Sequence, residues 1–120
     1  MIPIIANNWK GKKAVSDFNV HNELSHTALR PLDWEVITLF YSAMHFVDLY
    51  LLKHHNLKFS SHMERKRAVK RHLPQGIRNE YVGLYNYSRD ARYIRDISLK
   101  VRTEAEKKYN IIRQYILANI

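Results

Sequence analysis

The stretch from residue 84 to residue 96, LYNYSRDARYIRD, concentrates residue types that bind phosphate groups and stack on planar rings. It holds three arginines, three tyrosines and two aspartates within thirteen residues. Guanidinium groups bind phosphate oxygens bidentately, and aromatic rings stack on bases or on arginine planes. The composition of this stretch is therefore typical of a surface that holds RNA or a nucleotide.

Helical spacing divides the stretch into two faces. Leu84, Tyr87, Ala91 and Ile94 recur three or four residues apart, so we expect them to pack inward. An adjacent face carries the predicted phosphate-binding and stacking residues, which are Tyr85, Arg89, Arg92, Tyr93 and Arg95. We expect Arg89 and Arg92 to capture phosphate, and Tyr85 or Tyr93 to stack on a base.

A structural role is the alternative for these arginines. Arg92 and Asp96 form an i,i+4 pair that is common on solvated helix faces. A central apolar helix also carries a predicted structural polar stripe of Ser42, His45 and Asp48. Pairing of Asp48 with Arg89 or Arg92 inside the fold would need no ligand.

Composition and charge limit the class of protein. A chain of 120 residues with 46% hydrophobic content predicts one helical-bundle domain over residues 1–120. Within it, residues 1–11 are expected to form an irregular N-terminal segment. Cysteine is absent, and His54, His55 and His62 lack a second ligand pair, so no metal site is expected. The sequence has no Gly-rich phosphate loop, so no cofactor is expected.

The positive charge lies mostly in the second half of the chain. Residues 1–60 hold six basic and five acidic residues, net +1, whereas residues 61–120 hold fourteen and six, net +8. This asymmetry favours an anionic partner such as nucleic acid. The apolar run 34–52 contains Glu35, His45 and Asp48, which indicates a core helix rather than a membrane span, and we expect a cytoplasmic protein.

Start and stop signals predict five helices and no strand pair. The expected segments are about 12–29, 33–55, 61–73, 77–98 and a last helix from Thr103. Asp33 is the expected N-cap of the second helix, Asn56 its end, and Ser61–Glu64 and Thr103–Glu106 are capping boxes. The fold class is therefore all-α, an antiparallel bundle of four to five helices.

The central helix DWEVITLFYSAMHFVD, a Ser-His pair near a helix start and the tyrosine-rich helix ending SRDARY together resemble the HEPN superfamily (higher eukaryotes and prokaryotes nucleotide-binding domains). The resemblance covers about residues 33–96. It implies a helical bundle, usually a homodimer, in toxin–antitoxin, defence or RNA-processing systems.

Active members of that superfamily cleave RNA without a metal. They use an arginine, a following polar residue and a histidine four to six residues beyond the polar one. Arg89 and Asp90 match the first two, but Ile94, Arg95 and Asp96 occupy the histidine positions. The stretch 78–85 also resembles the motif, but Gly83 stands where the histidine would be. In the preceding helix, Arg65 or Arg67 together with His72 has the arginine-to-histidine spacing of the motif.

The expected function is a HEPN-like module that binds nucleic acid or a nucleotide. The first alternative is a metal-independent endoribonuclease whose base comes from another helix, with Arg89, His62 and His45 as catalytic candidates and His72 a further one. The second is a structural bundle that binds a nucleotidyltransferase partner.

Overall fold

A computed structural model describes residues 9–26, 31–93 and 97–120, and these residues form helices without a strand. The helices are α2 (Trp9–Ser25), α3 (Leu32–His55), α4 (His62–His72), α5 (Gln75–Tyr93) and α6 (Leu99–Asn119). The prediction of an all-α bundle is confirmed.

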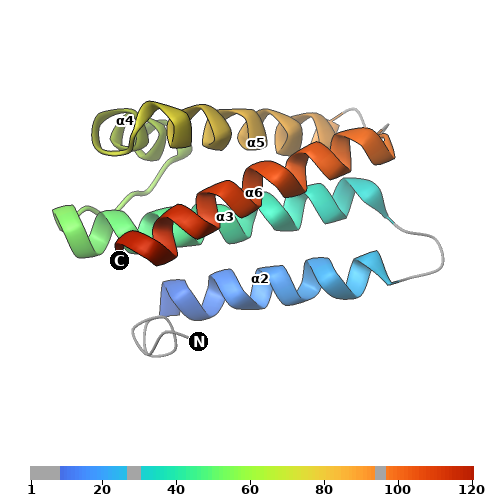
Figure 1. Ribbon diagram of the computed structural model, residues 1–120, viewed down its shortest axis with the longest axis horizontal. Coiled ribbons are helices and arrows are strands. Elements are labelled where there is room, and N and C mark those ends of the chain that lie inside the picture. Colours follow the sequence, from blue (N-terminus) through green and yellow to red (C-terminus); the bar gives the residue numbers. More distant parts are fainter. Residues whose placement is uncertain (1–8, 27–30, 94–96) are drawn as a thin grey trace.

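Four long helices alternate in direction, as Figure 1 shows. α2 and α5 run one way and α3 and α6 run the other, while the short α4 lies at one end of the bundle in the connection between α3 and α5. α3 is the central helix because it contacts each of the other four. This topology brings α4 and α5 together on the side of α3 opposite α2 (Figure 1).

α3 supplies half of the buried apolar side chains of the described core. Seven of its apolar side chains have no exposed surface, namely Val36, Leu39, Phe40, Ala43, Val47, Leu49 and Leu51. By length and composition α3 could cross a membrane, and 78% of its most apolar window is buried inside the bundle. A helix that is apolar nearly all round packs best where neighbours surround it.

Two predicted helix ends agree with the structure. Ser61 is the N-cap of α4, and its hydroxyl accepts the N–H of Glu64 at 3.2 Å. Asn56 ends α3 in the left-handed conformation, with φ 54° and ψ 39°. Asparagine tolerates that conformation better than most residues, so the chain can turn there.

Other predicted boundaries are wrong by as much as five residues. α6 begins at Leu99 because Ser98 is extended and its hydroxyl accepts the N–H of Val101 at 3.2 Å. Thr103, the predicted cap, lies inside the helix and donates to the carbonyl of Leu99. Since Ser98 caps the next helix, the segment expected at 77–98 was too long, and α5 ends at Tyr93.

The starts of α2 and α3 also differ from expectation. α2 begins at Trp9, so residues 9–11 are helical rather than irregular, and it ends at Ser25 rather than at 29. Residues 27–30, like residues 1–8 and 94–96, lie outside the described residues. α3 begins at Leu32 after Pro31 without a side-chain cap, so Asp33 is a first-turn residue rather than the N-cap.

Glu35 forms a buried polar cluster at one end of α3. It has no exposed surface, and its Oε1 accepts hydrogen bonds from Ser25 Oγ at 2.7 Å and from Arg102 Nε at 3.0 Å. His21 bridges the same cluster, with Nδ1 2.9 Å from the Glu35 carbonyl oxygen and Nε2 3.1 Å from Arg102 Nη2. A carbonyl only accepts and a guanidinium only donates, so neutral His21 with its proton on Nδ1 satisfies both contacts.

The predicted polar stripe of α3 runs along contacts with other helices. Ser42 Oγ donates to the carbonyl of Ala14 on α2 at 2.6 Å and lies 2.9 Å from Tyr109 Oη on α6. Because the single Ser42 hydroxyl proton is used on α2, Tyr109 is the donor in the second bond. His45 Nε2 lies 3.8 Å from Asp17 of α2.

Asp48 forms the second buried ion pair of α3. Its two oxygens accept from Arg65 Nε and Nη2 of α4 at 2.6 and 3.1 Å. Both residues are buried, with exposed fractions of 2% for Asp48 and 7% for Arg65. Lys10 Nζ of α2 lies 3.5 Å from the same carboxylate. The hypothesis that Asp48 pairs with Arg89 or Arg92 is wrong, because Arg65 fills that role.

Asp48→Ala should lower the free energy of unfolding by about 3–5 kcal/mol, because it leaves Arg65 buried without a counter-charge. Asp48→Leu with Arg65→Met should recover most of that loss, since a buried pair is replaced by apolar side chains of similar size. Denaturant unfolding followed by circular dichroism measures both. Glu104→Ala, which removes a 3.9 Å surface pair with Lys107, is the matched control; an equal loss in both single variants would contradict the structural role of Asp48.

Acidification should weaken the bundle through His21. Burial, together with the charge of Arg102, lowers the pKa of His21 below its ordinary 6.5, although the bond to the Glu35 carbonyl opposes the shift. Below pH 6.5 the unfolded chain therefore binds more protons than the folded chain. The contribution of neutral His21 to stability is fully present above pH 6.5 and is lost as pH falls toward the pKa of His21 in the folded state.

The free energy of unfolding should therefore fall between pH 7 and pH 5, with His21 adding at most about 1.4 kcal/mol per pH unit to the slope. His21→Gln should flatten that slope, and His26→Gln, at an exposed position just after α2, should not. Identical slopes in His21→Gln and wild type would show that His21 titrates alike in both states.

Candidate nucleic-acid interface

The predicted phosphate-binding residues lie along the C-terminal half of α5. Arg89 is exposed and makes no hydrogen bond or ion pair with any described residue. Tyr93 has an exposed fraction of 79%. Tyr85 is half-buried, with its ring 5.5 Å from that of Phe40 on α3. Arg95 lies outside the described residues, so its place beside the others stays a prediction.

Arg92 is held at the junction of α5 and α3. It is half-buried, and its Nη1 donates to Tyr41 Oη at 3.4 Å. Its Nε is buried and has no hydrogen-bond partner among the described residues. The side chain lines a cavity of about 360 Å³ together with Asp33, Trp34, Ile37 and Ala91. The Arg92 guanidinium is thus held in place by Tyr41, but its Nε donates no hydrogen bond to a described residue.

Trp34 is the residue of this region that sequence reasoning missed. It stands at the start of α3, lines the same cavity as Arg92 and has an exposed fraction of 56%. The sequence signal for it is a tryptophan in the first turn of an otherwise buried helix, although an unbroken apolar run by itself predicts core. Large aromatic side chains left in solvent beside a cation are typical of stacking surfaces.

His62 of α4 adjoins the same side of α5. Its ring lies 5.7 Å from that of Tyr85 and 5.9 Å from that of Phe40. Burial lowers the pKa of His62, and the charges of Arg65 and Arg92 lower it further, while Asp48 opposes the shift. The influence of Arg92 on this pKa indicates that the imidazole and the α5 arginine share one electrostatic environment.

The tautomer of His62 is fixed by Arg65. His62 Nδ1 lies 3.3 Å from Arg65 Nη1. A guanidinium only donates, so Nδ1 accepts this bond and neutral His62 carries its proton on Nε2. The ring therefore offers one N–H donor to a ligand and has no free basic nitrogen.

Lys66 completes the surface on α4. Its Nζ lies 5.5 Å from the centre of the Tyr85 ring, in cation–π geometry. We call the surface formed by α3, α4 and α5 the basic–aromatic strip; it consists of Trp34, His62, Lys66, Tyr85, Arg89, Arg92 and Tyr93. It joins cations that have no carboxylate partner among the described residues to exposed or half-exposed rings.

The other catalytic candidates lie elsewhere. His45 faces α2 through Asp17, and burial lowers its pKa, with Asp17 and Asp48 opposing the shift. His72 ends α4, where its ring stacks on that of His55 at 3.8 Å. No group of three His, Asp or Glu side chains suited to a metal ion occurs in the part of the chain that the structure describes.

Comparisons with protein-family models, with curated proteins and with solved structures found no match for this chain. The resemblance to the HEPN superfamily therefore rests only on the sequence motifs quoted above. The binding chemistry of this surface is argued from the geometry of the basic–aromatic strip.

Proposed function

We propose that the protein binds single-stranded RNA, or a nucleotide, through the basic–aromatic strip. Arg89 and Arg92 contact phosphate groups, and the rings of Trp34, Tyr85 and Tyr93 stack on bases. The resemblance to the HEPN superfamily supports the same function. A homodimer, or a complex with a nucleotidyltransferase, remains the expected assembly.

The observation that carries this proposal is that the half-buried Arg92 guanidinium has no carboxylate partner among the described residues. A partly desolvated cation without a counter-charge favours an anionic ligand. Tyr41 and the cavity wall hold the side chain in position. Because Nε has almost no exposed surface, a phosphate group would contact the terminal nitrogens of Arg92, in the bidentate geometry that guanidinium groups favour.

The aromatic side chains favour a single strand over a duplex. Trp34 and Tyr93 leave more than half of their surfaces in solvent, whereas most large apolar side chains of this bundle are buried. Unpaired bases stack on such rings with little regard to sequence, at about 1–3 kcal/mol for each base. In a duplex the bases are already stacked on one another.

The state of His62 favours binding over cleavage. A general base must have an unprotonated nitrogen within reach of the 2′-hydroxyl. In neutral His62 that nitrogen is Nδ1, which accepts from Arg65. The remaining Nε2–H donates to a phosphate oxygen instead. This geometry and the missing motif histidine together make the endoribonuclease the less favoured alternative.

Arg89→Ala/Arg92→Ala should weaken binding of labelled single-stranded RNA at least about tenfold, since charge-assisted hydrogen bonds contribute about 1.5–3 kcal/mol each. The slope of log K against log salt should become shallower by about 1.4, because two phosphate contacts are lost. Fluorescence anisotropy across a salt series gives both values. Lys100→Ala/Lys107→Ala, at two exposed α6 positions, is the charge-matched control.

Equal affinity in the two double variants would mean that total charge, rather than the strip, holds the RNA. The same incubations with EDTA test the alternative function. EDTA-resistant cleavage into 2′,3′-cyclic phosphate ends, lost in His62→Ala, would overturn the assignment of His62 as a donor only.

A further inference from the structure

A second basic surface lies on α4, apart from the strip. A cavity of about 670 Å³ opens between α4, the segment before it and the start of α5. Its lining comprises Leu57, Phe59, Glu64, Arg67, Ala68, Lys70, Arg71, His72 and Arg78. None of these residues belongs to the basic–aromatic strip. The volume lies within the range of small-molecule sites.

The lining carries four permanent cations and one carboxylate, net +3. None of the four cations forms an ion pair with a described residue. Arg67 has only a 3.7 Å contact with Met63 Sδ, and Arg78 donates to the Lys70 carbonyl at 2.8 Å. Glu64 Oε2 lies 3.4 Å from the Ser60 hydroxyl and N–H, and it forms no ion pair with a described residue. The positive charge of the cavity is therefore not neutralised from within.

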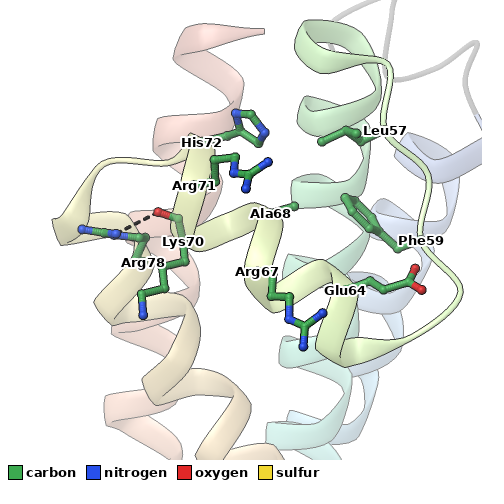
Figure 2. Close-up of a pocket in the computed structure, with 9 residues that line it drawn as sticks. All are labelled: Leu57, Phe59, Glu64, Arg67, Ala68, Lys70, Arg71, His72 and Arg78. Carbon is green, nitrogen blue, oxygen red and sulfur yellow. Dashed lines mark hydrogen bonds between the residues drawn. The ribbon is translucent and has the colours of Figure 1, made fainter.

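The cationic and apolar walls face each other. Figure 2 shows Arg71 and His72 extending from α4 toward the segment that carries Leu57 and Phe59. Lys70 and Arg78 lie on the other side of α4 and add to the positive field (Figure 2). A ligand seated here meets guanidinium groups on one side and an aliphatic and an aromatic side chain on the other.

We propose that this cavity binds a phosphorylated small molecule or chain end. Arg67 and Arg71, one helical turn apart, hold its phosphate groups, and Leu57 and Phe59 cover its ring. A free nucleotide and the 5′-phosphorylated end of an RNA share this chemistry. The site stands independently of the strip, because the two surfaces share no residue.

Isothermal titration with ATP, inorganic triphosphate and RNA hexamers with or without a 5′-phosphate tests the site. Arg67→Ala/Arg71→Ala removes two exposed side chains, so the bundle should stay folded. It should weaken binding of the phosphorylated probes at least about tenfold. Lys100→Ala/Lys107→Ala should not, and the response of the His72 pKa to the probes separates binding in this cavity from binding to the strip.

The comparison among probes identifies the source of the phosphate. Tighter binding of ATP than of triphosphate, lost in Leu57→Ala, supports a free nucleotide with its ring on the apolar wall. A preference for the 5′-phosphorylated hexamer, lost in Arg67→Ala/Arg71→Ala, supports an RNA end. No binding of any phosphorylated probe, or equal weakening by the α6 control, would overturn the site.

His72 gives a local readout of occupancy. Burial and then the neighbouring His55 and Arg71 lower the pKa of His72 in the free protein. A bound polyanion should raise that pKa, because it stabilises the imidazolium form. Titration by NMR with and without saturating triphosphate measures the shift. An unchanged His72 pKa at saturation would place the anion elsewhere and contradict the proposal.

Discussion

The bundle depends on two carboxylates that α3 carries into its core. Glu35 and Asp48 are almost wholly removed from water, and a buried charge is tolerated only with a partner and additional hydrogen bonds. Arg102 of α6 supplies that partner to Glu35, and Arg65 of α4 supplies it to Asp48. Each pair therefore fixes how one helix sits against α3. A change of register would leave a charge in the core without its counter-charge.

These pairs divide the arginines of the chain into two groups. Arg65 and Arg102 form ion pairs inside the fold, and removing either one would destabilise the bundle because it leaves a buried carboxylate without its counter-charge. Arg89 and Arg92 of α5, and Arg67 and Arg71 of α4, have no carboxylate partner among the described residues. Because the core already satisfies its own charges, these four arginines are available to the ligands proposed for the strip and for the second cavity.

α4 connects the structure to the proposed chemistry. One side of this short helix reaches Asp48 through Arg65 and touches Tyr85 through Lys66 and His62. Its outer side carries Arg67 and Arg71 along the second cavity. The same Arg65 that joins α4 to the core donates a hydrogen bond to Nδ1 of His62, because a guanidinium cannot accept one, and this bond sets the tautomer of that ring. The stability of the contact between α4 and α3 and the tautomer of His62 thus both depend on the guanidinium of Arg65.

Apolar periodicity and capping residues determined the helices, because both depend on neighbours within a few residues. The stop at Asn56 and the start at Ser61 followed from local signals, as did the central place of α3. The start of α6 was wrongly predicted at Thr103, because serine and threonine are both favoured N-caps and only the structure shows that Ser98 accepts the N–H of Val101. Only the tertiary structure decided that Asp48 pairs with Arg65 rather than Arg92, that Trp34 remains exposed and that His62 lies beside Tyr85. Those contacts join separate helices, and the spacing along one helix carries no information about which face of another it meets.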